Sequence, residues 1–429
     1  MDHSHEVSLD INEIANSLRE QLKINKAFSE ACCIYRVPER LRKLNEKAYT
    51  PRGVSIGPLH HGKENLKAME GHKIMYLQQF LGQNLLVSLE DLINIIKENE
   101  TKLRDSYAET IDLSRKDFAT MILLDAVFII MVLLNWKYMS EFHESRRSDH
   151  IFYRPFKIND VVFDMSLLEN QLPFFILQKL FERSSGAANP QNCTLTELTC
   201  GLFKCQWPDW VKEDSLKIID SSGVLHFVDF LQKCQQPTEK HSPAKEEAFL
   251  SAPTATELHQ SGVTFKRSDK SSLLDITFNN GILEIPQLKI YDEIESLFRN
   301  LQAFEQCHNY ANGDTFVNDY ITFISCLVSA TKDVEVLAQN ENLKNMLSSD
   351  ETVSNLFHNL VIENVTSSET FLSGLCEELN LHCRKRRHKW KANLKQVYFN
   401  NPWTGISVFA ATFLLVLTVI QTVCSILQL

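Results

Sequence analysis

The chain has 429 residues, of which 44% are hydrophobic and 23% charged, a composition that excludes wholesale disorder and suits one large core or two ordinary ones. Its net charge of −10 is uneven, because residues 384–429 carry seven Lys/Arg and no Asp/Glu, which leaves 37 basic and 54 acidic residues before them. An acidic body excludes a general nucleic-acid partner, since attraction to phosphate backbones needs a basic face.

The eleven cysteines stand at irregular spacings without a C-x-x-C pair. This pattern is typical of free thiols in a reducing compartment rather than of a disulfide framework or a structural zinc site. Phosphate-cradling and nucleophile-elbow motifs are also absent from the sequence, so no metal and no cofactor are predicted.

Residues 1–30 are predicted to contain an amphipathic helix, because apolar residues such as Ile14 and Leu18 recur at helical spacing over 8–22. We expect this helix to dock on the body. Residues 1–20 lack the continuous apolar run of a secretory signal peptide.

Residues 31–383 are predicted to form a large, mainly helical soluble body. Prolines and glycines favour extended chain and turns over 31–58, around a short helix at 39–46. Small polar residues and prolines predict loops at 184–192 and 235–256, the second of them long and mobile. Apolar periodicity predicts further helices at 64–80, 118–136, 164–181 (broken near Pro173), 292–304 (capped by Asp292 and Glu295), 316–337, 351–362 and 369–399.

The segment 118–136 is apolar enough to be mistaken for a membrane span. Asp125 near its middle argues against that, because a carboxylate at the centre of a bilayer costs roughly 2.5 to 3.5 kcal/mol. Ser114 and Asp117 form a capping pair before it. We therefore expect a central core helix, packed against the segment 164–181.

Residues 263–286 are predicted to form a small antiparallel β-hairpin unit. Apolar and polar residues alternate on both sides of Asn280-Gly281, the dipeptide preferred in type I′ turns. Residues 263–266 add a third strand, and Pro286 closes the unit.

The adjacent His60 and His61 are the most reactive-looking cluster, since two imidazoles near a glycine-rich turn can bind metal or transfer protons. The pair lacks the H-E-x-x-H spacing of a zinc site, which favours a structural role. The alternative is a membrane-tethered enzyme that uses His60 and His61 with nearby carboxylates.

The remaining candidates are acids and cysteine-histidine dipeptides. Asp125, Asp164 and Glu169 could pair as catalytic carboxylates, but acids embedded in apolar segments more often form buried hydrogen bonds. In Cys307-His308 and His382-Cys383 the two side chains are adjacent in sequence, so neither dipeptide directs both toward one metal.

The C-terminal segment 402–428 is predicted to be a transmembrane helix, because residues 396–429 contain no charged side chain and roughly 20 apolar residues span a bilayer. Thr418, Thr422 and the neighbouring Gln421 could bond a second helix and create an oligomer, or the hydroxyls could bond back to their own helix. The residues expected to form the membrane anchor are Trp403, Phe409, Phe413, Leu417, Ile420 and Gln421.

The preceding segment 384–401 is basic and should contact lipid headgroups on the cytosolic side. A single-pass protein with a cytosolic body follows, in the plasma membrane or the endoplasmic reticulum. Sequons at Asn192 and Asn364 test this sidedness, because they would accept sugar on the opposite side. The residues expected at the headgroups are Arg384, Lys385, Arg386, Arg387, Lys389 and Lys391.

Several strings together resemble the plant domain-of-unknown-function family 247, from about residue 33 to the C-terminus. Leu59 is a departure, since the family usually has Tyr before the histidine pair. The strings are C-I-Y-R-V-P (33–38), V-S-I-G-P-L-H-H-G (54–62), L-E-N-Q-L-P-F-F (168–175), A-T-E-L (255–258), L-D-I (274–276), L-E-I-P (283–286), L-F-R-N-L (297–301), F-E-Q-C-H (304–308) and N-P-W (401–403).

The resemblance implies a plant membrane-associated protein without an established enzymatic activity, and some grass members are implicated in pollen self-incompatibility. It carries over no catalytic residue. We interpret the chain as a non-catalytic, membrane-anchored interaction protein with an unknown protein partner, in recognition or signalling. The loop 235–256 is the surface expected to discriminate partners.

Overall fold

The computed structural model describes most of the body and the C-terminal helix. The predicted loop at 184–192 and the basic segment 385–401 lie outside the described residues, as does most of the loop 235–256. The structure describes residues 14–19, 29, 31–84, 86–138, 149–183, 193–212, 214–216, 219, 223–237, 251–270, 272–309, 315–365, 370–384 and 402–427.

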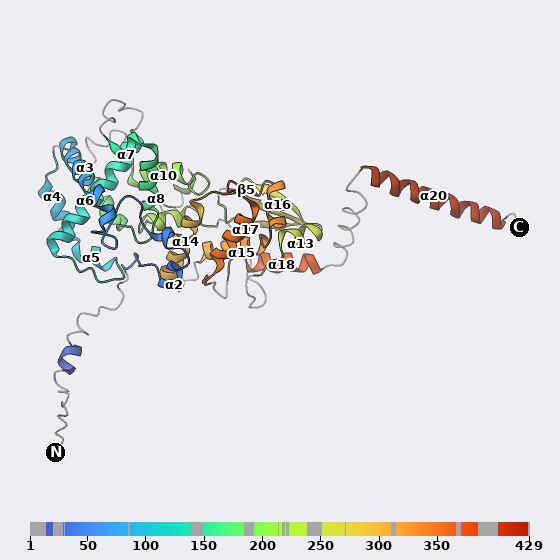
Figure 1. Cartoon of the computed structure of the whole chain (residues 1–429), viewed down its shortest axis with the longest axis horizontal. Helices are drawn as coiled ribbons and strands as arrows, with labels where there is room; N and C mark the ends of the chain where they lie inside the picture. Colours follow the sequence, from blue (N-terminus) through green and yellow to red (C-terminus); the bar gives the residue numbers. More distant parts are fainter. Residues whose placement is uncertain are drawn as a thin grey trace, which may run out of the picture.

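The body is mainly helical, as the sequence predicts, and its first part is a group of helices around α6 (Figure 1). Short 3₁₀ helices stand where the prolines and glycines interrupt the chain. The elements of this part are α2 (Glu39–Arg42), η1 (Glu46–Tyr49), η2 (Glu64–Met69), α3 (Glu70–Gln83), α4 (Leu89–Glu98), α5 (Glu100–Asp105), α6 (Arg115–Lys137), α7 (His150–Tyr153), α8 (Pro155–Met165), α9 (Phe174–Arg183), α10 (Leu195–Gln206) and α12 (Phe227–Lys233).

Helix α6 is the centre of this group, and the predicted core helix is confirmed. The Ser114 side chain caps it by accepting a hydrogen bond from the backbone N–H of Asp117. Helices α3, α4, α9 and α10 pack around it and bury nearly all of its apolar side chains. The carboxylate of Asp125 is buried 2.6 Å from the ammonium of Lys73 on α3. Because the only charge in the helix centre is paired, α6 fits a protein interior.

The segment 164–181 differs from the single broken helix that was predicted. Helix α8 already begins at Pro155 and ends at Met165, an irregular segment follows over 166–173, and α9 begins at Phe174. The irregular segment is buried throughout and supplies polar side chains to its surroundings.

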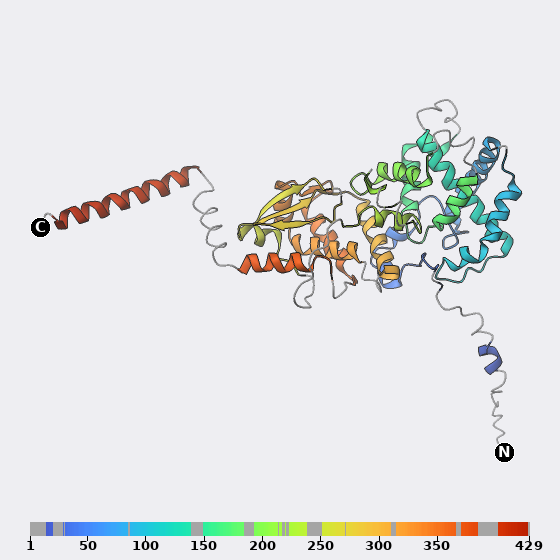
Figure 2. The ribbon, with the colours of Figure 1, turned by 180° about the vertical axis from the view of Figure 1, so that it is seen from behind.

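The second part of the body combines helices with two small sheets (Figure 2). Its elements are α13 (Ala255–Gln260), β1 (Thr264–Ser268), β2 (Thr277–Asn279), β3 (Ile282–Pro286), β4 (Leu288–Ile290), α14 (Ile294–Phe304), the π-helical turn η4 (Glu305–Asn309), α15 (Phe316–Leu327), α16 (Thr331–Gln339), β5 (Leu343–Asn345), α17 (Asp350–Val361) and α18 (Ser373–Arg384).

The predicted hairpin is confirmed as the antiparallel pair β2–β3. Asn280 and Gly281 both have positive φ, 51° and 81°, as a type I′ turn requires. The sheet is not purely antiparallel, because β1 pairs with β3 in parallel, Thr264 opposite Ile282. A second, parallel pair of β4 and β5 was not predicted, since three-residue strands leave no alternation to detect.

Two details of the later helices correct the sequence predictions. Glu293 occupies the N-cap of α14 without a side-chain bond, and Glu295 instead bonds Arg299 and Asn45, so the predicted cap is wrong. The predicted helix 316–337 is two helices, α15 and α16.

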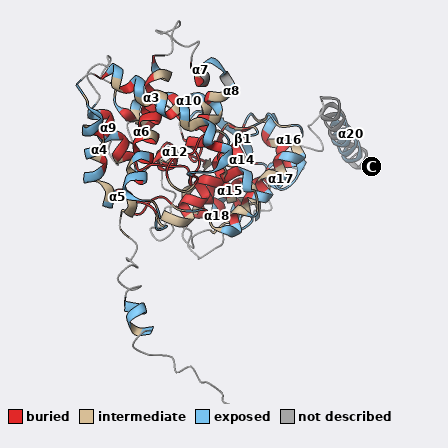
Figure 3. Ribbon diagram, turned by 60° about the vertical axis from the view of Figure 1, so that its left-hand side comes forward, coloured by how far each residue is buried: buried red, intermediate tan, exposed pale blue. Residues whose placement is uncertain are grey.

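Both parts share one continuous hydrophobic core, which runs from Val37 to Leu379 (Figure 3). The predicted loop 235–256 begins as expected after the end of α12 at Lys233, but its first residue is not on the surface and its C-terminal bound is wrong. Gln235 is buried, where its amide donates to the carbonyl of Trp210 and accepts from the N–H of Leu273. Helix α13 already begins at Ala255.

The chain ends carry two further helical segments. Residues 14–19 are helical, but Ile14 and Leu18 are 42% and 52% exposed, so the expected docking on the body is wrong for these side chains. At the other end, α20 (Pro402–Leu427) forms a helix over the predicted anchor. Its described apolar side chains are exposed.

Candidate functional site

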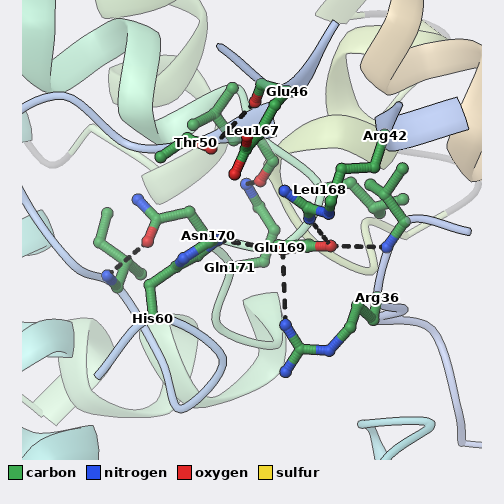
Figure 4. A network of polar contacts seen from close by, with 12 residues as sticks. Arg36, Arg42, Glu46, Thr50, His60, Leu167, Leu168, Glu169, Asn170 and Gln171 are labelled. Atoms are coloured by element: carbon green, nitrogen blue, oxygen red, sulfur yellow. Dashed lines mark hydrogen bonds and ion pairs between the residues drawn. The ribbon is translucent and has the colours of Figure 1, made fainter. Parts of the chain in front are cut away.

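A buried charge network centres on Glu169, which lies in the irregular segment between α8 and α9 (Figure 4). One carboxylate oxygen accepts from the backbone N–H of Val37 at 2.7 Å and from the guanidinium of Arg42. The other lies 3.1 Å from Nε2 of His60 and 3.8 Å from the guanidinium of Arg36. Four groups from residues 36–60 thus meet one carboxylate.

The side chains that follow Glu169 in the sequence bind backbone groups rather than charged side chains. Asn170 accepts from the N–H of Ile56 and donates to the carbonyls of Val54 and Asp164. Gln171 accepts from the N–H of Phe227. Since each amide bonds backbone groups that would otherwise be buried without partners, the segment works as a template for the chain around it.

Two further acids repeat this pattern. Asp164 accepts from the backbone N–H groups of 52–54 at 2.7 to 2.8 Å. Asp125 accepts from the N–H of Gly57 at 2.8 Å in addition to its ion pair with Lys73. The three acids therefore hold different parts of the 36–60 segment: Glu169 its two ends, and Asp164 and Asp125 the parts between. Each carboxylate has its own set of partners, and among the described residues no contact joins them as a catalytic pair.

The charges in the network follow from burial and pairing. Burial alone would raise the pKa of Glu169, but the hydrogen bond to His60 and the charge of Arg42 lower it below the usual range. Burial lowers the pKa of His60, against the opposing effect of Glu169. The site thus holds a neutral imidazole beside an ionised carboxylate, with Arg42 and Arg36 as its cations.

The structure separates the two histidines that the sequence places side by side. His60 is 1% exposed, whereas His61 is exposed on the surface. The Nδ1 atom of His60 has no hydrogen-bond partner within the described part of the chain. A general acid or base must reach its substrate within hydrogen-bond distance, and the side chain of His60 is fully covered. The enzyme interpretation stays a prediction without support from this geometry.

Metal ligation finds no support either among the described residues. No group of three or more His, Cys, Asp or Glu side chains there could hold a metal ion. The ring of His308 instead bonds the hydroxyl of Tyr35 at 2.9 Å, and His382 packs edge-on against Phe278.

The predicted anchor residues lie on α20. Phe413, Leu417 and Ile420 are 57%, 43% and 53% exposed, and Gln421 is exposed as well. The side chains of Trp403 and Phe409 lie outside the described residues. The hydroxyls of Thr418 and Thr422 bond back to carbonyls of their own helix, which was the second of the two alternatives for this stripe.

Of the predicted headgroup residues, only Arg384 lies in the described part of the chain. It is exposed at the end of α18 and lines a groove of about 570 Å³ with Asn380 and Ser261. The others fall in 385–401, outside the described residues: Lys385, Arg386, Arg387, Lys389 and Lys391.

A search for membrane spans among the described residues identifies one helix that is long and apolar enough, Arg115–Lys137, and 78% of its most apolar stretch is buried inside the protein. The stretch Phe413–Val423 of α20 is apolar but shorter. Neither result tests the membrane prediction for 402–428, because the first concerns the core helix α6 and the second covers only part of α20.

Fold and site together define a mainly helical protein in which buried polar residues fasten the segment 36–60 to a helical core. The chain belongs to the plant family DUF247, described as "Plant protein of unknown function", whose sequence profile matches residues 34–417. The predicted family membership is confirmed.

Two relatives from Arabidopsis thaliana match nearly the whole chain. The UPF0481 protein At3g47200 is 30% identical, over 95% of this chain and 89% of its own length. The putative UPF0481 protein At3g02645 is 21% identical, over 95% and 93%. The search of solved structures found no match.

Sequence reasoning found Glu169, Asp164 and His60 but missed the partners that give them their roles. Arg36 and Arg42 stand in a short basic helix and its approach, where nothing in the spacing indicates a buried carboxylate. The one available signal for these partners was the family resemblance, because the strings that carry it include L-E-N-Q-L-P-F-F as well as those around Arg36 and His60.

Proposed function

We propose that the protein is a non-catalytic, membrane-anchored interaction protein whose last helix enters the lipid. The observation that carries this proposal is α20: an uncharged helix over Pro402–Leu427 whose described apolar side chains are exposed to solvent. Exposing a continuous apolar helix to water is costly, and a bilayer or a second apolar helix removes that cost.

Sequence features support lipid, rather than a second helix, as the surroundings of the apolar side chains of α20. Helix α20 has 26 residues, enough for the roughly 20 that cross the hydrocarbon core. The seven Lys/Arg of 384–395 precede it, and such clusters remain on the cytosolic side. The body therefore faces the cytosol in this proposal, at the plasma membrane or the endoplasmic reticulum.

The interaction role rests on what the site lacks. The side chains of His60 and Glu169 are fully covered, and Glu169 binds the backbone N–H of Val37 and the side chains of Arg42 and His60. Recognition or signalling through an unknown protein partner is the role we propose, of which self-incompatibility is one form implied for some members by the family resemblance.

The test is fractionation of the full chain against a truncation that ends at Lys395. After alkaline carbonate extraction we expect the full chain to remain with membranes and to float with them in a density gradient, whereas the truncation stays in the supernatant. A truncation that still pellets with membranes, or a full chain that is freely soluble, contradicts the proposal.

Pairing through α20 is the second part of the proposal. A Gln421→Leu variant keeps the helix apolar but removes its one side-chain amide, which in lipid contributes roughly 0.6 to 2 kcal/mol when bonded across helices. We expect weaker co-precipitation of two tagged copies. Unchanged co-precipitation would exclude Gln421 as the contact.

A further inference from the structure

A small polar pocket of about 150 Å³ opens where the chain after α10, strand β1 and strand β4 meet. Its volume is several times the roughly 30 Å³ that one water molecule occupies in the liquid. The cations Lys212, Arg267, Lys270 and Lys289 line it together with the acids Asp209 and Asp269. This excess of positive charge stands out in a body that is acidic overall.

The acids near the pocket do not neutralise it. Lys289 forms an ion pair with Asp209 at 2.8 Å, and Arg267 forms one with the exposed Glu341 at 3.7 Å. The ammonium of Lys212 has only a long contact of 3.4 Å, to the carbonyl of Lys270. No carboxylate among the described residues lies within ion-pair distance of Lys212.

The environment of Lys212 is electropositive and partly dry. Burial lowers the pKa of the Lys212 ammonium, and the charges of Lys289 and Arg267 lower it further, whereas Asp209 opposes them. An anion in the pocket would relieve this repulsion and supply Lys212 with a charged hydrogen-bond acceptor in addition to the distant carbonyl of Lys270.

The walls of the pocket are held in position before any ligand arrives. The hydroxyl of Ser268 accepts from the N–H of Lys270. The amide of Asn342 donates to the carbonyls of Lys266 and Ile285, which joins the neighbouring strands. A preformed arrangement of donors costs little ordering on binding.

We propose that the Lys212–Arg267–Lys289 pocket binds a phosphate group, carried by free phosphate or by the headgroup of a phosphorylated lipid. A tetrahedral oxyanion offers several acceptor oxygens to the cations that line the pocket, and both ammonium and guanidinium groups bind it well. The pocket is too small and too polar for an apolar ligand. The proposal is independent of the role of α20.

The test uses the full chain in non-ionic detergent and measures binding calorimetrically at low salt. The two probes are inorganic phosphate and soluble inositol trisphosphate. Lys212→Met removes the unpaired cation at similar side-chain length, and we expect its affinity to fall tenfold or more, as for the loss of one charge-assisted hydrogen bond. Lys332→Met, an exposed lysine on α16, removes the same charge elsewhere and should leave affinity unchanged.

Tighter binding of inositol trisphosphate supports the proposal and assigns the lipid headgroup, whereas equal binding of both probes supports it and assigns free phosphate. No saturable binding of either probe, or an equal loss in Lys332→Met, overturns it. Should Lys212→Met fail to unfold cooperatively, Arg267→Gln at the exposed rim replaces it, and an affinity equal to that of the unmodified chain overturns the proposal as well.

Discussion

Glu169 is the residue on which the contacts of the 36–60 segment converge. Glu169→Gln keeps its shape but removes its charge, which leaves the partly buried Arg42 without its anion. Removing one partner of a buried ion pair is costly, and we expect the unfolding free energy to drop by about 3 kcal/mol. Urea unfolding of the full chain in detergent measures the change.

The control for this variant is His61→Ala, at an exposed neighbour of the network, which should change the unfolding free energy by less than about 0.5 kcal/mol. The folded state lowers the pKa of Glu169, so its charge contributes stability at neutral pH and the contribution is lost as the pH falls through that lowered value. A Glu169→Gln variant as stable as the unmodified chain at pH 7 would show that the network is dispensable.

We expect Asp319 to give the free energy of unfolding the opposite dependence on pH. Burial raises its pKa from 3.8 to about 8, and the nearby Glu305, itself raised to about 7, adds to the shift. An acid whose pKa is raised by folding binds its proton more tightly in the folded state. The free energy of unfolding therefore declines as the pH rises from about 4 to 8, by up to about 1.4 kcal/mol per pH unit for one proton.

The Asp319→Asn variant removes this proton and should flatten the decline, while the new amide oxygen still accepts from the N–H of Phe371. Unfolding measured at pH 5, 6, 7 and 8 compares the two slopes. Parallel slopes would exclude Asp319 as a source of the dependence.

At the scale of elements, Gly57 joins two parts of the fold. Its φ is +70°, and a Cβ placed there would lie 2.5 Å from the carbonyl oxygen of Gln171. Gly57→Ala should therefore destabilise the protein by more than about 2 kcal/mol, through the left-handed backbone and the clash together. Thermal unfolding checks this.

The matched control makes the same substitution inside a helix. Gly82 on α3 has open space around its Cα, so Gly82→Ala should stabilise by roughly 0.5 to 1 kcal/mol. Equal effects of the two alanines would mean that the contact between Gly57 and Gln171 does not matter.

Local sequence patterns predicted helices and turns correctly where those patterns were strong. The capped apolar run of α6 and the turn at Asn280-Gly281 are specified by adjacent residues, and both are confirmed. Strand β5, the irregular segment 166–173 and the buried Gln235 are specified by contacts with distant residues, which no window of sequence contains. The same reason hid the partners of Glu169 and the pocket around Lys212.

At the scale of the whole molecule, sidedness decides which partners the body can reach. The amide of Asn364 donates to the carbonyl of Asn318 and the hydroxyl of Thr322, so this native sequon is a poor reporter once the body has folded. Leu86 is 95% exposed, and Leu86→Asn completes an N-x-S sequon with Val87 and Ser88.

We expect the Leu86→Asn chain to stay unglycosylated in plant cells, because the body faces the cytosol in our proposal. Glycosidase treatment followed by gel mobility measures this. Behind an added secretory signal peptide, this variant should carry one glycan more than Leu86→Gln behind the same signal, because Leu86→Gln keeps only the native sequons at Asn192 and Asn364. That difference in mobility proves that the new site can accept sugar. A glycan on Leu86→Asn without the added signal would reverse the proposed orientation.

The acid in the middle of α6, Asp125, has a consequence for the chain while it is being made. This helix is synthesised before α20, and until other helices fold against it, it presents a stretch that is long and apolar enough to span a membrane. The buried carboxylate of Asp125 lowers its preference for lipid at that stage, and its cation arrives from a segment already synthesised. If α20 enters the lipid as proposed, the carboxylate of Asp125 makes α6 a poorer candidate for membrane insertion than the uncharged α20.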